Sequence, residues 1–358
     1  MRGAERPIRL IWSSPAKTGS TMRIPDKNLD CVIYLYANAI DAKHGKEYGG
    51  SGFLALVESE RVKGRYWGYA VTNAHVIKKG YTVVRASVSD NQTYIANVKE
   101  KDWYCSKTDD LAVHNIDIPY QFRATSIHKN QFYNEPAFAD QLREHAAASS
   151  NHIGVGDDVI MLGRFTGYDG IQQNRPVVRS GIISLMPAVE ITKPDGVTKQ
   201  WSYLIECKSL SGFSGSPVFV YRRNPGYPFK GPKDENGGVF EYESWLLGID
   251  WGHLPVIEEI YDDTKQEEMR KTPFRVNVNS GFAGVIPVQR LRVLLDDPKL
   301  RKDREDEEME LDKQAVKKKT AIEDTAEKPR KNRDVSIPPI SRKKFFAGLT
   351  RATKRKAD

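Results

Sequence analysis

Short strand-like runs at regular intervals constrain the fold of this chain more than any other feature of its sequence. From residue 30 to residue 118, runs of Val, Ile, Tyr and Thr alternate with Gly, Asn and Asp, which favour turns. We expect strands at residues 31–37, 52–58, 66–72, 81–87, 93–99 and 111–116. This spacing is typical of a β-sandwich or a β-barrel.

A second set of such runs follows at residues 158–162, 177–185, 202–206, 216–221, 245–250, 274–277 and 284–286. The two sets are similar in length, which favours two β-domains. Residues 137–148 have helix-forming composition and predict a connecting helix, and residues 288–295 predict a helix that closes the second domain. The acidic stretch 258–268 reads as a surface loop. We therefore predict an N-terminal arm (1–26), a first β-domain (27–125), a connector (126–154), a second β-domain (155–297) and a tail (298–358).

The tail carries most of the charge of the chain. Residues 299–358 hold 19 Lys and Arg against 12 Asp and Glu, so they contribute +7 of the net +8. The remainder is close to neutral, and its charge implies no polyanionic partner. Too few apolar residues remain in the tail to offset the entropy of ordering, so we expect disorder or a marginal helix there.

Other classes of protein find little support in the sequence. Cys31, Cys105 and Cys207 form no Cys-x-x-Cys pair, and we expect buried free thiols. The seven histidines show no metal-binding spacing, so we predict no metal site and no cofactor. No apolar stretch approaches the ~18 residues of a membrane span, and the apolar run near the N-terminus is shorter than a signal peptide needs. A cytoplasmic location is our expectation.

The strongest chemical signal is the segment Gly212-Phe213-Ser214-Gly215-Ser216-Pro217, just before an apolar strand. A nucleophilic serine needs a tight turn of small residues, because backbone N–H groups must converge on the developing oxyanion. We assign Ser214 as a candidate nucleophile, and the N–H groups of Gly212 and Ser214 as its oxyanion hole. Without further signals, the same segment also fits a plain Gly/Ser loop.

Two weaker signals lie earlier in the chain. Thr72-Asn73-Ala74-His75-Val76 places an imidazole at the end of an expected strand, and Asp109-Asp110-Leu111-Ala112-Val113 places carboxylates before another. Each alone fits a structural histidine or a turn aspartate. We prefer Asp110 to Asp109 because it directly adjoins the apolar run.

Together the three segments resemble, in the same order along the chain, the catalytic motifs of the trypsin/chymotrypsin-like serine peptidases. Within that family they are most similar to the small bacterial trypsin-like type. The likeness extends over residues 30–297. It implies an all-β chain of two antiparallel six-stranded barrels with the site between them. It also implies peptide-bond hydrolysis by Ser214, with His75 as general base and Asp110 orienting the imidazole. The substrate would be a protein or peptide.

The resemblance also suggests substrate-binding residues and shows departures from the family pattern. Asp250-Trp251-Gly252 is similar to the strand that lines the specificity pocket, and Lys208 falls where the pocket floor is usually built, although such a lysine also fits a solvated side chain. An acidic residue at position 250, near the expected catalytic residues, would either adjust the activity of the site or impair it. Phe213 stands where the family usually has Asp or Asn, so we expect no activation through a newly cleaved N-terminus.

Three rival readings remain. An α/β-hydrolase also uses Gly-x-Ser-x-Gly, but position 216 is Ser and only His253 follows the serine. A catalytically inactive peptidase fold would serve as a binding module. In the third reading the basic runs 342–346 and 351–356 of the tail bind nucleic acid or another anionic partner, against the plainer reading of a solvated linker or tether to a protein.

Overall fold

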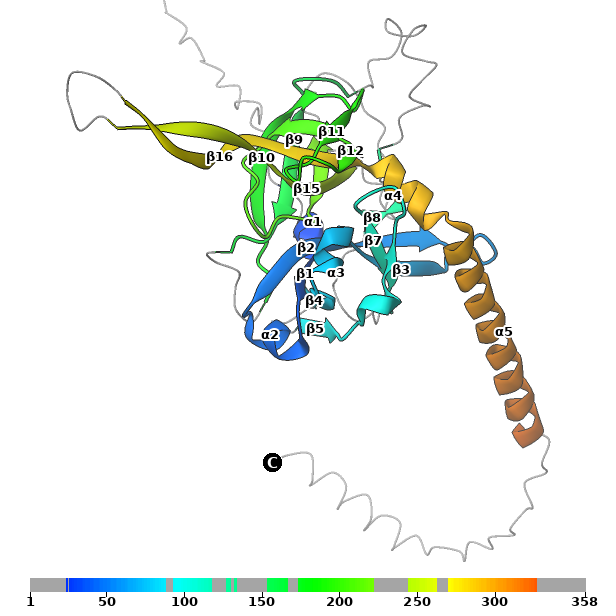
Figure 1. Ribbon diagram of the computed structural model, residues 1–358. Coiled ribbons are helices and arrows are strands. Elements are labelled where there is room, and N and C mark those ends of the chain that lie inside the picture. The colour runs from blue at the N-terminus through cyan, green and yellow to red at the C-terminus, as the bar shows by residue number, and fades with distance from the viewer. Residues whose placement is uncertain are drawn as a thin grey trace, which may run out of the picture. The chain divides into compact units, whose positions relative to one another are not determined.

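The computed structural model describes residues 24, 26–87, 93–117, 127–129, 132–133, 153–166, 173–221, 244–262 and 270–326. It is mostly β-structure, as the sequence predicts (Figure 1). The expected connecting helix at 137–148 and the basic runs at 342–346 and 351–356 lie outside the described residues.

The first half of the chain forms an eight-stranded sheet. Its strand order is β5-β4-β1-β2-β3-β7-β6, and β8 pairs in parallel with β2. The strands are β1 Val32–Tyr36, β2 Tyr48–Glu58, β3 Tyr66–Thr72, β4 Val83–Ser87, β5 Thr93–Ala96, β6 Tyr104–Cys105, β7 Ala112–Asn115 and β8 Ile127–His128. Short helices accompany them, namely α1 Asp26–Asp30, α2 Ala39–His44, α3 Ala74–Lys78 and the 3₁₀-helix η1 Glu100–Asp102.

This sheet differs from the closed six-stranded barrel that the resemblance implies. In the described part of the chain, β5 and β6 are its two edges and are not paired with each other. Strand β6 has only two residues, so it offers too few main-chain groups to extend the ladder further. All six strands expected from the sequence in this half are present, with ends that differ by a few residues.

The second half closes into a six-stranded antiparallel barrel, in the order β10-β13-β16-β15-β14-β9. Its strands are β9 Asp158–Gly163, β10 Val177–Leu185, β13 Tyr203–Glu206, β14 Pro217–Tyr221, β15 Ser244–Asp262 and β16 Arg270–Pro287. A separate hairpin, β11 Glu190–Thr192 and β12 Lys199–Trp201, lies between β10 and β13 in the sequence. The expected second barrel is therefore confirmed.

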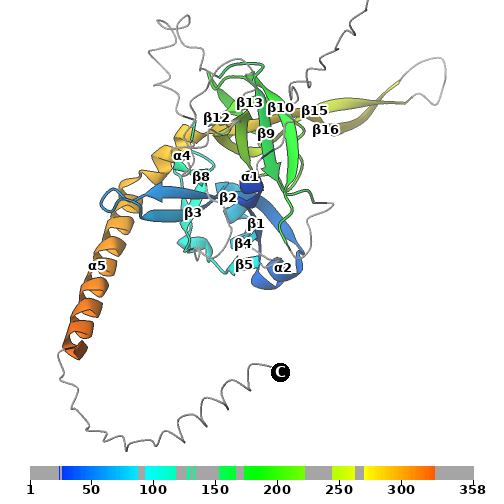
Figure 2. The same ribbon diagram turned by 180° about the vertical axis from the view of Figure 1, so that it is seen from behind.

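Strands β15 and β16 are much longer than the sequence predicts. They remain paired from Gly248 with Pro287 out to Asp262 with Arg270, and they project from the barrel as a two-stranded arm (Figures 1 and 2). The prediction of a loop at 258–268 is therefore wrong for Glu258–Asp262, while residues 263–268 lie outside the described residues. Residues of opposite charge, such as Glu259 and Arg275, face each other across the two strands, and such pairs favour strand pairing. The sequence prediction missed this ribbon because it identified strands by alternating apolar residues, which an exposed ribbon lacks.

Helix α4, Val288–Leu295, agrees with the predicted closing helix. For the tail we expected disorder or a marginal helix, and its first part forms helix α5, Pro298–Ala326. Glu, Lys and Arg are strong helix formers, proline is accepted at a first helical position, and an i,i+3 ion pair joins Lys313 to Glu310 at 2.9 Å. Local propensity therefore gives a helix without an apolar core.

The chain divides into two compact units, Met1–Arg301 and Lys302–Asp358. Within the first unit, one hydrophobic cluster contains buried residues of both halves, including Tyr34, Phe53, Val159 and Ile249. The sheet and the barrel are thus packed around a shared core. Because strand β1 is buried along its whole length, no face of it is left to solvent.

The three cysteines are free thiols. Cys31 and Cys207 are buried as expected, and burial raises the pKa of Cys207 to about 12, whereas Cys105 is only half-buried. Helices in the described ranges fall short, in length or in apolar character, of what crossing a membrane requires.

Candidate active site

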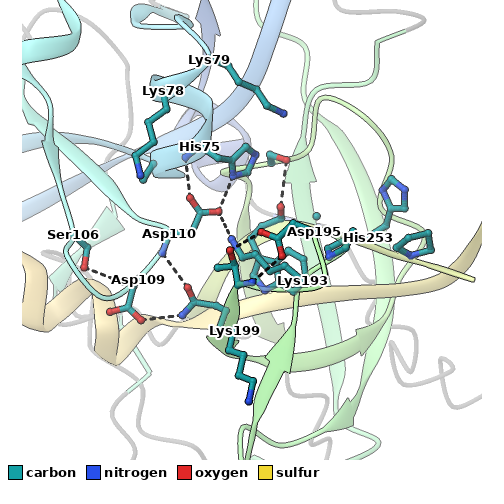
Figure 3. A pocket seen from close by; sticks show the side chains of 18 of the residues that line it. His75, Lys78, Lys79, Ser106, Asp109, Asp110, Lys193, Asp195, Lys199 and His253 are labelled. Carbon is teal, nitrogen blue, oxygen red and sulfur yellow. Dashed lines mark hydrogen bonds and ion pairs between the residues drawn. The ribbon is translucent and has the colours of Figure 1, made fainter.

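His75, Asp110 and Ser214 all line one cavity of about 770 Å³ (Figure 3). They come from three separate stretches of chain, and the structure brings them together from the sheet and the barrel. A smaller cavity of about 230 Å³ is also lined by His75 and Ser214, together with Gly212. Open space therefore borders the serine and the imidazole in two places.

His75 is the second residue of the one-turn helix α3, which begins two residues after strand β3 ends. Its backbone N–H donates to Asp110 Oδ1 at 2.8 Å, and its Nδ1 lies 2.6 Å from Asp110 Oδ2. The side chain of Asn73 donates to the Asp110 carbonyl at 2.9 Å. The start of α3 is thus fastened to the loop that carries the carboxylate.

The carboxylate of Asp110 is ionised and held in place. Its side chain is only 10% exposed, and burial would raise its pKa. The hydrogen bonds and positive charges of His75 and Lys193 outweigh burial and hold the pKa of Asp110 well below its usual range. An ionised carboxylate on Nδ1 leaves Nε2 as the imidazole nitrogen available to accept a proton.

Asp109 has a different role from its neighbour. Its Oδ1 accepts hydrogen bonds from Arg290 Nε at 2.8 Å and from Gln200 Nε2 at 2.9 Å. Asp109 and Asp110 both lie in the loop between β6 and β7, residues 106–111, which we call the acidic loop. The ion pair of Asp109 with Arg290 anchors this loop to helix α4. Of the two adjacent aspartates, it is Asp110 that contacts the imidazole.

Ser214 lies in a tight turn between β13 and β14. Gly212 and Gly215, on either side of it, have φ angles of +97° and +91°, which glycine adopts without strain. The Ser214 hydroxyl donates to the Trp251 carbonyl at 3.5 Å, and among the described residues no hydrogen bond joins it to His75. Serine–base hydrogen bonds are often long in unliganded enzymes and shorten when substrate binds.

Strand β2 holds this turn from across the molecule. The Ser51 N–H donates to the Ser214 carbonyl at 2.8 Å, and the Ser51 hydroxyl donates to the Gly212 carbonyl at 2.7 Å. From the barrel side, the Gly215 N–H donates to the Asp250 carbonyl at 2.8 Å. No local sequence pattern singles out Ser51 for this role, because its partners are main-chain carbonyls far away in the sequence.

The proposed oxyanion hole consists of the backbone N–H groups of Gly212 and Ser214. Neither of them donates a hydrogen bond to any residue that the structure describes. Phe213, between them, is fully buried, with Arg179 positioned 5.7 Å from its ring centroid. Packing of this side chain, rather than an ion pair, anchors the centre of the turn.

Two of the predicted substrate-binding residues line the cavity and two do not. Trp251 and Gly252 line it together with Ser214. Lys208 is exposed and does not line it, as is usual for a lysine ammonium without a buried partner, and its role in substrate binding stays a prediction. Asp250 does not line the cavity either, because its side chain is fully buried and contacts the Ser209 hydroxyl.

Asp250 supports the turn from behind instead of facing substrate. Its carboxylate accepts the Ser209 hydroxyl at 3.1 Å and the Gly252 N–H at 3.3 Å. Burial raises the pKa of Asp250 to about 7, against the opposing effect of these two hydrogen bonds. The main chain of Asp250 exchanges hydrogen bonds with Gly215 and Ser216. Asp250 therefore helps to hold the turn that carries Ser214.

Lys193 and Gln200, on the hairpin β11–β12, contact the acidic loop and were not predicted. Lys193 Nζ donates to Asp110 Oδ2 at 2.6 Å, and the Asp110 N–H donates to Gln200 Oε1 at 2.9 Å. The hairpin strands have only three residues each, and Lys-Pro-Asp-Gly between them reads as an ordinary turn. No sequence signal points from this turn to a residue 83 positions earlier.

Part of the chain matches the model of a known protein family. Residues 50–224 match the model of the trypsin-like peptidase domain, and this range contains His75, Asp110 and Ser214. No curated protein sequence matches the chain.

The solved structures that match the chain have low sequence identity. The inactive form of the protease Rv3671c from M. tuberculosis is 17% identical, with 76% of this chain and 90% of that chain covered and a TM-score of 0.38. The HtrA-type protease AlgW is 18% identical over 69% of this chain and 51% of that one, with a TM-score of 0.36. Human heparin binding protein is 10% identical, covers 77% and 96%, and has a TM-score of 0.40.

The family match covers both halves of the candidate site, from strand β2 to the end of β14. It agrees with the mostly β architecture and with the motifs read from the sequence. Over residues 50–224, the chain is therefore similar to the trypsin-like peptidase domain family.

Proposed function

We propose that this chain is a serine endopeptidase that hydrolyses peptide bonds in a protein or peptide substrate through an acyl-enzyme intermediate. The observation that carries the proposal is the partly buried His75–Asp110 pair, joined at 2.6 Å, in the cavity that Ser214 also lines. Imidazole, carboxylate and hydroxyl are the three groups that such chemistry needs.

In the proposed reaction, Ser214 Oγ attacks the scissile carbonyl carbon while its proton passes to His75 Nε2. The N–H groups of Gly212 and Ser214 stabilise the oxyanion of the tetrahedral intermediate. The C–N bond then breaks, and His75 gives its proton to the leaving amine. Water, activated by the same imidazole, attacks the acyl-enzyme and releases the carboxylic acid product. Throughout, Asp110 orients the ring and stabilises its cationic form.

Cleavage within a chain, rather than at its end, fits the space around Ser214. The larger cavity leads from the serine along Trp251 and Gly252, and the smaller one is lined by Gly49 and Tyr81. A polypeptide that passes the serine needs room for residues on both sides of the scissile bond. Two adjoining cavities provide that room.

An inactive binding module is the second candidate. It is favoured by the hydrogen bond of the Ser214 hydroxyl to the Trp251 carbonyl, which leaves the serine without a hydrogen bond to the imidazole. If substrate binding does not redirect this hydroxyl, the groove would bind peptides without cleaving them.

Labelling with a fluorophosphonate probe separates the two candidates. We expect the probe to attach to Ser214, as located by peptide mass spectrometry, because only an activated serine reacts. Ser211 lines the same two cavities and provides a matched control, so Ser211→Ala should label as wild type and Ser214→Ala should not. Absence of labelling in folded wild-type protein would favour the binding module.

Hydrolysis of a peptide library by the same proteins tests the roles of the three side chains. We expect Ser214→Ala and His75→Ala each to lower turnover by on the order of 10⁶, and Asp110→Ala by about 10⁴. The smaller loss is expected because Asp110 acts through the imidazole. A mild effect of His75→Ala on turnover would contradict the proposed mechanism.

A further inference from the structure

The hairpin β11–β12 reaches from the barrel half of the chain to the carboxylate of the site. Its turn, residues 193–196, is closed by a hydrogen bond from the Gly196 N–H to the Lys193 carbonyl at 2.9 Å, and Gly196 has a φ of +73°. The Lys193 N–H donates to the Thr198 carbonyl at 2.7 Å. The backbone of Lys193 is therefore fixed at the point where strand β11 enters the turn.

The ammonium of Lys193 shares one carboxylate oxygen with His75. Lys193 Nζ and His75 Nδ1 each lie 2.6 Å from Asp110 Oδ2 (Figure 3). The side chain of Lys193 is only 12% exposed, and its ammonium lies 5.0 Å from the ring centroid of Trp251. A lysine held this way is desolvated, and its contact with Asp110 is screened far less than a surface ion pair.

A second side chain of the hairpin holds the same loop. Gln200 is buried, and its amide accepts the Asp110 N–H and donates to Asp109 Oδ1, both at 2.9 Å. The hairpin thus fixes the main chain of Asp110 through Gln200 and the side chain through Lys193.

We propose that Lys193 is a positioning residue of the active site, which orients the Asp110 carboxylate and offsets part of its negative charge toward His75. This inference rests on the proposed peptidase function. A carboxylate that already faces an ammonium attracts a proton onto the neighbouring imidazole less strongly than a free one. Lys193 consequently extends the pH range of the neutral, proton-accepting imidazole toward lower pH.

Other ionisable groups surround the imidazole and must be considered in any pH profile. Those that line the same cavity are Lys78 and Lys79 of α3, Lys107 and Asp109 of the acidic loop, Asp195 and Lys199 of the hairpin, and His253 of β15. In the described part of the chain, none of these side chains makes a hydrogen bond or ion pair with the side chain of Asp110 or His75, and Asp109 pairs with Arg290. Lys193 is distinguished from them by its direct contact with Asp110.

The test is the pH dependence of kcat/KM for the full chain with a neutral peptide substrate. We expect Lys193→Met to move the midpoint of the acid limb to higher pH by about 1 unit, because the full carboxylate charge then favours the protonated ring. KM should not change, since Lys193 acts on Asp110 and not on substrate. Lys193→Arg, which keeps the charge, should retain the wild-type midpoint.

Lys199→Met is the matched control. Lys199 lies on the same hairpin and lines the same cavity, but it is exposed and has no ion pair with a described residue. Its loss should leave the midpoint unchanged. If Lys193→Met and Lys199→Met have the same profile as wild type, the inference about Lys193 is wrong while the proposed function stands.

A measurement that does not depend on peptide hydrolysis can test the role of Lys193 separately from the proposed peptidase function. The ring titration of His75, followed by NMR in folded protein, should have its midpoint at higher pH in Lys193→Met, or in Lys193→Gln if the Met variant does not fold. An unchanged ring titration in the neutral variant that folds would overturn the inference. Wild-type protein that neither labels with fluorophosphonate nor hydrolyses peptides would refute the proposed function instead.

Discussion

At the scale of single residues, two buried aspartates near Ser214 are in opposite states. Asp110 has cationic partners and remains ionised, whereas Asp250 has only a hydroxyl and an N–H as partners. Burial without a counter-charge explains why the pKa of Asp250 rises to about 7. The pKa of the same residue type is thus shifted downward at Asp110 and upward at Asp250.

Asp250 makes the stability of the fold depend on pH. Because its pKa is higher in the folded protein than in the unfolded chain, the folded state holds the proton more tightly. The free energy of unfolding should therefore fall as pH rises from about 4 through about 7, and level off above that. We expect Asp250→Asn to remove this loss and to be more stable than wild type at pH 8 by on the order of 2 kcal/mol.

Urea unfolding of wild type and Asp250→Asn at pH 5 and pH 8 measures this difference. Glu258→Gln provides a control in the same strand β15, because Glu258 is exposed and its loss should leave the pH dependence unchanged. Equal loss of stability between pH 5 and pH 8 in wild type and Asp250→Asn would show that Asp250 is not the cause.

At the scale of elements, the turn before β14 depends on close contact with strand β2. A Cβ on Gly215 would collide with the Ser51 carbonyl oxygen and the Thr72 hydroxyl, and the φ of +91° is itself unfavourable for other residues. Position 215 therefore needs glycine for two reasons, namely its positive φ angle and the lack of space for a Cβ atom.

Gly215→Ala and Gly196→Ala separate these two requirements. Both glycines have positive φ, but an added Cβ at Gly196 meets open space. We expect Gly196→Ala to cost about 1 kcal/mol of unfolding free energy, and Gly215→Ala to cost at least about 2 kcal/mol more and to abolish labelling of Ser214. Similar losses of stability in the two variants would mean that the contact with β2 relaxes easily.

At the scale of the whole molecule, the end of the first unit at Arg301 defines where the tail can be removed. Leu300 is buried in the hydrophobic cluster, so a cut before residue 300 would remove a core side chain. The charged segment that follows supplies no residue to the cavity around Ser214 among the residues described.

Deletion of residues 302–358 should leave peptide hydrolysis within about twofold of the full chain, because no described residue of that segment lines the cavity around Ser214. Hydrolysis and thermal unfolding of the truncated protein measure this. A loss of hydrolysis by truncated protein that remains folded would show that the charged segment takes part in activity.

Much of the fold follows from local pattern. Strands β3 and β10 have the ends that residue type and turn signals predict, and α4 follows from its apolar spacing. The order of the His, Asp and Ser segments, each at the edge of an expected strand, was enough to select the three side chains. These are properties of short windows, so the sequence alone carries them.

The tertiary structure decided what depends on contact between distant segments. It placed Lys193 and Gln200 against Asp110, and Ser51 against the turn that holds Ser214. It also buried Asp250 and left Lys208 exposed to solvent. A lysine in a polar turn has the same local pattern whether it faces water or a carboxylate 83 residues away. Motif and periodicity therefore fix which groups are available, and only the packing of sheet against barrel determines which of them meet.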